Sequence, residues 1–539
     1  MTIRRLAAVV GALALPALLA AQTSVAGTRA PNQRLDAEYE RFYRAQTGDA
    51  KFGSPLVDHL PLAQGVPTPK DVLGYYIGTP RKLTYYEDIL KYYRALAAAS
   101  PRVRIETIGR SDEGRELVVV WISSEANIRG LDANKANLAG IADPRGKSDA
   151  EVRQLIAQTK PHYHLMGGLH SGETGPSEVL MELAYRLVAS ESPFMTQIRD
   201  NVIVSLTPVA DADGRDRNVD WFYAGLERED AARADSAAGR TTTVTPGSAA
   251  LPYWGKYVYH DNNRDINLSQ VQMRTITNWY FTAHPPIIHD LHESLALLYT
   301  YSGGPPQNPN LDPLLFGELN FFANWELSQM TKWGMPGVYT HAFMDGWSPG
   351  YLGSVAYNHN GMMRMYETQS GRDVDPTVQP PAGGRGGAPG AGGRGAAGAG
   401  GRGGAGGAGG GAGAGGAAAA GAAGGAQAGA AAAAAGEGAG AGGGRGAAAG
   451  AGAAAGGAPI RAGVPTGRGG GQPREWYRGI PIPDGYPARF TRRNNANYMQ
   501  TGVLSALQLT AMFPELVLEN FYVKTRNSLQ AGRRSAPYA

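Results

Sequence analysis

The stretch PHYHLMGGLHSGETGPSEVLMELAYRLVAS, residues 161–190, passes from a short apolar run into a helical pattern. Its first ten residues favour a buried strand, and residues 175–190 favour a helix. NVIVSLTPVA (201–210) and PPIIHDLHE (285–293) are further short apolar runs. Because short apolar runs alternate with helices, we predict an α/β fold with a mixed, largely parallel twisted sheet flanked by helices.

Ligands of such folds gather at the carboxyl ends of the strands. His170, Asp213 and His292 are expected to lie at these ends. Upstream, residues 83–100 have aromatic and aliphatic side chains at helical spacing. The next segment predicts a hairpin, with strands over 103–108 and 117–122 and a turn at Asp112-Glu113-Gly114.

The region from about 382 to 471 is nearly all glycine and alanine. It has almost no large apolar side chain to bury, so we expect a disordered insertion. Residues 497–513 and 514–529 then predict two helices whose apolar stripes need a partner. We therefore expect one domain in two parts, 81–381 and 472–530, with the tract as a long loop inside it.

The chain opens with two arginines, an apolar core and small residues, the pattern of a secretory signal peptide over residues 1–21. Residues 28–80 form an N-terminal extension that is a candidate pro-segment. There is no cysteine, which excludes disulfides, cysteine nucleophiles and Cys-based zinc sites. The net charge of +4 comes from the leader and the tract, where six arginines face one glutamate. The remaining body is slightly acidic, and nothing in it indicates nucleic-acid binding.

His170 and Glu173 form a His-x-x-Glu pair, which also occurs by chance and does not establish a metal site alone. A hydrolytic zinc site takes three protein ligands and leaves a fourth position for water. His289 and His292 are three apart in a predicted strand and face opposite sides. His292, at the strand end, is the better third ligand, and Asp290 shares its face and could orient it.

The chain resembles the zinc carboxypeptidases of the carboxypeptidase A type. The resemblance covers about residues 80 to 372 and follows the family's motif order. The segments that carry it are YYEDILKYYRALAAASPRVRIETIGRSDEGRELVVVWIS, GGLHSGETG, TPVADADG, DNNRDIN, DLHES and MYETQS. It implies a single zinc ion, Zn2+, held by His170, Glu173 and His292, since His₂Glu is the ligand set of carboxypeptidase A.

The resemblance also implies that Glu367 is the general base, and that Asn263 and Arg264 hold the substrate carboxylate. A glutamate beside an activated water accepts its proton and passes it to the leaving amine. Burial raises the pKa of such a carboxyl and a nearby dication lowers it, so the sequence leaves the pKa of Glu367 open. Arginine binds a carboxylate through a planar, bidentate fork. The alternative for Asn263 and Arg264 is a capped turn before a helix.

Two further roles stay open between residues. The cation that stabilises the oxyanion is Arg215, Arg217 or Lys256. The aromatic residue that covers the substrate is Tyr351 or Trp347. The residue that sets side-chain specificity lies in the same uncertain stretch.

The sequence thus predicts a secreted or periplasmic zinc metallocarboxypeptidase, a monomer with no membrane span after signal removal. Its substrate would be a peptide or protein with a free C-terminal carboxylate. One alternative is a zinc amidase or peptidase acting on cell-wall peptides or N-acyl amino acids. Two others are a non-catalytic binding module with the same fold and a surface-attached structural protein whose Gly/Ala tract is the working part.

Overall fold

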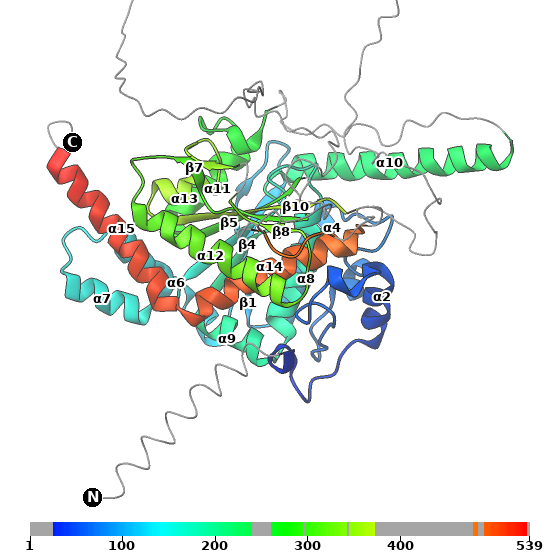
Figure 1. The fold of residues 1–539 in the computed structure, drawn as a ribbon, viewed down its shortest axis with the longest axis horizontal. Helices are drawn as coiled ribbons and strands as arrows, with labels where there is room; N and C mark the ends of the chain where they lie inside the picture. Colours follow the sequence, from blue (N-terminus) through cyan, green and yellow to red (C-terminus); the bar gives the residue numbers. More distant parts are fainter. Residues whose placement is uncertain are drawn as a thin grey trace, which may run out of the picture. The chain divides into compact units, whose positions relative to one another are not determined.

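An eight-stranded sheet runs through the computed structural model of the chain (Figure 1). The structure describes residues 25–239, 260–294, 297–341, 344–371, 478–482 and 490–535, which all belong to one compact unit. The predicted signal peptide (1–21) and the predicted Gly/Ala-rich insertion (382–471) lie outside these residues.

The strands of the sheet lie in the order β1-β2-β4-β3-β5-β10-β6-β8. Four neighbouring pairs are parallel: β4–β3, β3–β5, β5–β10 and β6–β8. The other three pairs are antiparallel. The bounds are β1 Val103–Arg110, β2 Glu116–Ile122, β3 His162–Met166, β4 Ile203–Thr207, β5 Ile287–Ser294, β6 Leu298–Thr300, β8 Val338–Tyr339 and β10 Met362–Gln369, with β7 Gly304–Gln307 and β9 Asp345–Gly346 paired separately. The predicted mixed, largely parallel sheet is confirmed.

All five residues of β3 and of β4 are buried, as expected for central strands covered on both faces. The predicted hairpin is present as β1 and β2, and its turn contains Gly114 with a φ of +86°. A positive φ is strained for side chains with a Cβ, which explains the glycine at this turn.

Helices cover both faces of the sheet (Figure 1). Their bounds are α2 Ala37–Thr47, α3 Pro69–Leu73, α4 Tyr86–Ala99, α5 Glu125–Arg129, α6 Leu131–Ala142, α7 Asp149–Gln158, α8 Gly175–Ala189, α9 Pro193–Asn201, α10 Ala212–Ala237, α11 Val271–Ala283, α12 Pro313–Lys332, α13 Ser354–Asn358, α14 Arg492–Met512 and α15 Pro514–Ser535. Short 3-10 turns are η1 Val25–Thr28, η2 Ala50–Phe52 and η3 Asn262–Arg264. Pro514 begins α15, as predicted, where its missing N–H costs no helical hydrogen bond.

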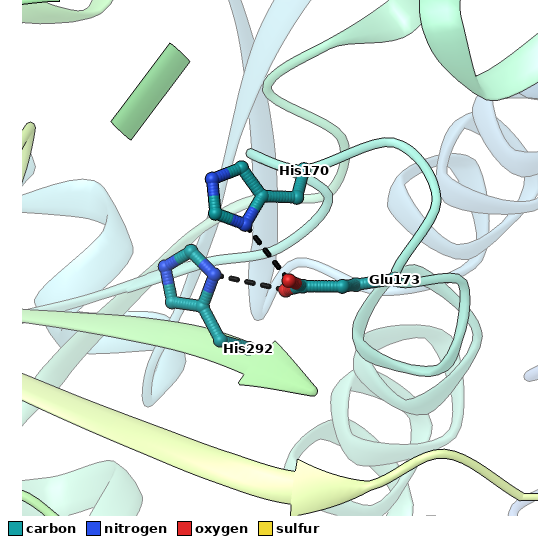
Figure 2. Close-up of side chains that lie close together, drawn as sticks. All are labelled: His170, Glu173 and His292. Carbon is teal, nitrogen blue, oxygen red and sulfur yellow. Dashed lines mark hydrogen bonds and ion pairs between the residues drawn. The ribbon is translucent and has the colours of Figure 1, made fainter. Parts of the chain in front are cut away.

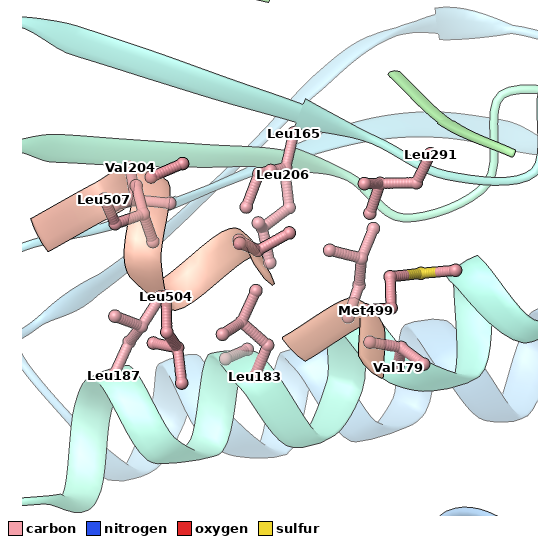
Figure 3. Close-up of a cluster of buried hydrophobic side chains, with 14 of the residues drawn as sticks. Leu165, Val179, Leu183, Leu187, Val204, Leu206, Leu291, Met499, Leu504 and Leu507 are labelled. Carbon is pink, nitrogen blue, oxygen red and sulfur yellow. The ribbon is translucent and has the colours of Figure 1, made fainter. Parts of the chain in front are cut away.

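The main apolar core lies between the sheet and the helices α8 and α14 (Figure 3). Its side chains include Leu165, Leu206 and Leu291 of the sheet, Val179, Leu183 and Leu187 of α8, and Met499, Leu504 and Leu507 of α14. Burying each such side chain contributes about 1.5–3 kcal/mol. The apolar stripe of α14 therefore has its partner within the same core as α8.

The N-terminal segment is tied to α8 and α14 by a buried ionic network. Glu182 of α8 accepts hydrogen bonds from Arg186 at 2.9 Å and from Arg493 of α14 at 2.7 Å. Tyr39 of α2 donates to the same carboxylate at 3.0 Å. Arg493 also donates to the Ile77 carbonyl at 3.0 Å. Segments from both ends of the chain thus meet on the helix that follows Glu173.

The C-terminal helices bear on whether a helix of this chain could span a membrane. Within the described ranges, no single helix combines the length and apolar composition of a membrane span. Arg492–Met512 and Pro514–Arg534 reach that composition only together, across a bend of 83°.

Candidate metal centre

The loop after β3 carries His170 and Glu173. Gly168 has a φ of +63°, and a Cβ there would lie 2.7 Å from Ser177 Oγ, so glycine fits this turn. Later in the same loop, the amide of Glu173 donates to the carbonyl of His170 at 3.0 Å. This tight turn places both side chains at the carboxyl end of β3, immediately before α8.

The structure brings His170, Glu173 and His292 together (Figure 2). One potential ligand atom from each residue lies within 4.8 Å of the others. Nδ1 of His170 is 2.8 Å from Glu173 Oε1, and Nδ1 of His292 is 2.9 Å from Glu173 Oε2. We call these three residues the candidate metal centre.

Each imidazole meets a second carboxylate on its other nitrogen. His170 Nε2 lies 2.9 Å from Asp261 Oδ1, and His292 Nε2 lies 2.8 Å from Asp290 Oδ2. A proton on Nε2, donated to that carboxylate, leaves the Nδ1 lone pair facing Glu173. Nδ1 of both rings therefore faces the Glu173 carboxylate.

These contacts set the pKa values of the centre. Burial would lower the pKa of His170, but the carboxylates of Glu173 and Asp261 outweigh it and raise the pKa to about 9. For His292, burial is again opposed by Asp290 and Glu173, which raise the pKa well above its usual range. Burial would raise the pKa of Glu173, and the two imidazoles hold it below its usual range instead. The centre therefore attracts positive charge.

The donor set fits a divalent metal such as zinc. Two imidazole nitrogens and a carboxylate converge, and each imidazole has the carboxylate partner that metal-bound histidines usually have. Among the described residues, this is the group of histidine and acidic side chains that could hold a metal.

Glu367 lies on β10 beside the candidate metal centre. In the parallel register of β10 and β5 it stands opposite His292. Residues paired in this way point to the same face of a sheet. Burial raises the pKa of Glu367, His292 opposes the rise and Glu173 adds to it, for a result of about 7. A carboxyl with this pKa can both accept and donate a proton near neutral pH.

Asn263 and Arg264 lie in η3, close to the centre. The Asn263 side chain is buried: Oδ1 accepts from the Leu352 amide at 2.9 Å, and Nδ2 lies 3.2 Å from His292 Nε2. Arg264 is 36% exposed, and its guanidinium lies 4.4 Å from the ring centroid of Tyr351. Arg264 is therefore the member of this pair with donors available to a ligand at the surface.

The residues left open by the sequence separate into different environments. Arg215 is buried and donates to the carbonyls of Thr84 and Thr174 and to the carboxylate of Glu178. Through these contacts Arg215 holds α8 and the N-terminal segment together. Arg217 is 45% exposed and meets Glu113 at 3.1 Å. Lys256 lies outside the described residues.

The structure also shows the surroundings of Trp347, Tyr351 and Asp213. Trp347 is 52% exposed, whereas Tyr351 is half-buried under Arg264. Asp213 lies in the first turn of α10 and accepts from Ser111 at 2.7 Å, and it is not one of the three potential ligands. It supports the β1–β2 hairpin.

Asp261 is a residue that the sequence reasoning missed. It directly precedes the Asn-Asn-Arg motif, and it binds His170 Nε2 while capping η3 through the Asn263 amide at 2.8 Å. The signal was present in the quoted DNNRDIN motif. Nothing in the spacing alone links residue 261 to residue 170, because their contact spans 91 positions.

Comparison with known families gives one match within the chain. Residues 89–236 match the family model described as zinc carboxypeptidase. No curated protein matches the chain. The matched segment contains His170 and Glu173, and it ends before His292 and Glu367.

Among solved structures, similar chains include a metallo-carboxypeptidase from Burkholderia cenocepacia (13% identity, TM-score 0.34), covering 53% of this chain and 60% of that one. Another is a metallo-carboxypeptidase from Pseudomonas aeruginosa in complex with (2-guanidinoethylmercapto)succinic acid (13% identity, TM-score 0.34), covering 54% and 62%. A third is carboxypeptidase A from Helicoverpa armigera (17% identity, TM-score 0.32), and the match covers 55% of this chain and 69% of that one. The chain thus spans about three fifths of the two bacterial structures. The resemblance to the zinc carboxypeptidases is confirmed by the family model over residues 89–236, the segment that carries the His-x-x-Glu pair.

Proposed function

We propose that this chain is a secreted zinc metallocarboxypeptidase that hydrolyses C-terminal peptide bonds. The observation that carries the proposal is the register of β5 and β10. It sets Glu367 beside His292, while His292 shares Glu173 with His170. A base beside a three-ligand centre is the arrangement that metal-assisted hydrolysis needs. The family match over 89–236 supports the same reading.

Zinc, when bound by His170, Glu173 and His292, would polarise the scissile carbonyl and make a water nucleophilic at neutral pH. Glu367 takes the proton of the attacking water and then delivers it to the leaving amine. Burial raises the pKa of Glu367 to about 7, and a dication at the centre would lower it and so favour the base form at the start of the cycle. Asp261 and Asp290 hold the two rings in place through Nε2.

Arg264 would bind the free C-terminal carboxylate of the substrate. Its guanidinium is partly exposed and is held against the Tyr351 ring, so less side-chain freedom is lost on binding. Asn263 would contribute through its position between His292 and Leu352, where the Leu352 amide holds its Oδ1. The oxyanion-stabilising cation stays open between Arg217, whose partly exposed guanidinium meets Glu113 at 3.1 Å, and Lys256, which lies outside the described residues.

The test is release of C-terminal amino acids from a broad peptide panel, with and without a chelator. We expect release that stops with the chelator and returns when zinc is added back. Glu367→Gln should retain zinc and lose about 10²–10⁴-fold in kcat. Absence of chelator-sensitive release from every peptide would refute the peptidase function.

Two alternatives give different outcomes in the same assay. A zinc amidase or peptidase acting on cell-wall peptides or N-acyl amino acids would cleave such substrates and accept amidated peptides as well as free carboxylates. The engagement of the Asn263 amide within the protein is the observation that keeps this alternative in view. A non-catalytic binding module would bind zinc and peptide without release. Export can be checked by N-terminal sequencing of the extracellular or periplasmic protein, which should begin near residue 22.

A further inference from the structure

Asp290 is a buried carboxylate with a single partner. Its side chain is 1% exposed, and Oδ2 lies 2.8 Å from His292 Nε2. Oδ1 has no hydrogen-bond partner among the described residues. Among the described residues, the imidazole of His292 is also the one ion-pair partner of Asp290.

Several other buried carboxylates of this protein meet permanent cations, whereas Asp265 meets His260 and Asp211 has no ion-pair partner among the described residues. Glu182 pairs with two arginines, Glu326 with Arg364, and Glu318 with Lys524. Burying a carboxylate is costly unless it is paired and hydrogen-bonded. Asp290 has only a ring whose positive charge depends on a proton or a metal. Its burial is therefore best compensated when a cation occupies the neighbouring centre.

The geometry also fixes the orientation of the ring. Asp290 and His292 are two residues apart on β5 and face the same side of the sheet. With its Nε2 proton donated to Asp290, His292 presents Nδ1 toward Glu173 Oε2 at 2.9 Å.

We propose that Asp290 is a positioning residue of the metal centre: its buried carboxylate fixes the His292 ring and strengthens the hold of the centre on a divalent cation. The inference rests on the proposed zinc function. Outer carboxylates of this kind typically change metal affinity 10–100-fold. A residue serving only the fold would leave the affinity of the folded protein for zinc unchanged.

The experiment measures zinc affinity of the full chain by competition with a chromophoric chelator, together with Tm with and without zinc. Asp290→Asn keeps an acceptor oxygen and removes the charge. We expect zinc affinity to fall 10–100-fold. We also expect a smaller zinc-dependent rise in Tm than in the wild type, with a metal-free Tm no lower than that of the wild type.

Asp58→Asn is the matched control, since Asp58 meets His59 Nδ1 at the same 2.8 Å in the N-terminal segment. It should leave zinc affinity unchanged. Asp290→Ser, which removes the charge without adding bulk, is the second variant. Unchanged zinc affinity in either folded variant, or loss of folding in both even with zinc, would overturn the inference. Failure of the wild type to bind zinc would instead overturn the proposed function.

Discussion

Two pairs of histidines in this protein have opposite electrostatic environments. His162 and His164 lie in β3, and His170 follows eight residues after the first of them in the same stretch and pairs with His292. The rings of His162 and His164 pack against Trp121 at 4.6 Å and Trp279 at 4.4 Å. Burial lowers the pKa of His162 to about 3 and that of His164 well below its usual range.

The difference comes from the neighbours and not from the residue type. His162 and His164 share one hydroxyl, Ser205 Oγ, at 2.6 and 2.7 Å. His170 and His292 share one carboxylate, Glu173. A hydroxyl between buried rings stabilises neutral imidazole, whereas a carboxylate stabilises the protonated or metal-bound form. The first pair is therefore part of the packing, and the second can recruit a cation.

The largest expected effect is the loss of zinc binding and peptide release when a histidine of the second pair, but not of the first, is replaced. His292→Ala should abolish stoichiometric zinc binding and chelator-sensitive peptide release, because one of three ligands is lost. The matched variant His164→Gln should keep both, since His164 contacts Ser205 and Thr207 and none of the three potential ligands. Elemental analysis and the release assay measure this. Zinc loss in His164→Gln would show that the pairs are not independent.

The next effect is a stability loss in acid. The folded pKa of His162, about 3, is depressed below its unfolded value of about 6.5. The unfolded chain therefore binds the proton first, and this contribution is present above pH 6.5 and lost as pH falls toward 3. We expect about 1.4 kcal/mol lower free energy of unfolding per pH unit for this histidine.

Urea unfolding at pH 7, 6 and 5 checks the acid effect. His162→Gln should show a shallower loss with falling pH than the wild type. Both proteins retain the same metal centre, so proton competition for zinc cancels in the comparison. Parallel slopes in the two proteins would mean that His162 is protonated in the folded state.

The smallest effect tests the shared hydroxyl. Ser205→Ala should destabilise the fold by about 1–3 kcal/mol, because two buried imidazoles lose a partner. Ser177→Ala is the control: its hydroxyl is buried and has no hydrogen-bond partner among the described residues. It should change the free energy of unfolding by less than about 0.5 kcal/mol. Equal losses in both variants would indicate a packing effect and not a hydrogen-bond effect.

Much of the sheet follows from local pattern. The alternation of short apolar runs and helices was enough to predict β3, α8, β4 and β5 in order. Boundaries shifted by one to four residues, as at β3, which ends at Met166 and not at residue 170, and at α4, which begins at Tyr86 and not at residue 83. The last two helices were also predictable from their apolar stripes, with α14 beginning five residues earlier than expected, at Arg492.

The centre was predictable only in part. His170, Glu173 and His292 were chosen through a family resemblance, and the structure places them together. Asp261 was missed because its contact with His170 depends on how η3 meets the β3 loop. The burial of Arg215 was equally invisible, since its partners Thr84 and Glu178 lie 131 and 37 positions away. Such long-range pairings are decided by tertiary packing, which periodicity does not encode.

The ionic network around Glu182 has a consequence for synthesis. Asn497 of α14 donates to Thr47 of α2 across 450 positions, beside the contacts of Arg493. At roughly 5–20 residues per second on the ribosome, the partners of the first-made helix emerge roughly 20–90 s after it. During that wait the buried tyrosines of α2 lack the native contacts that α14 supplies. The amino-terminal helix therefore completes its native packing on α14 only after nearly the whole chain has been made.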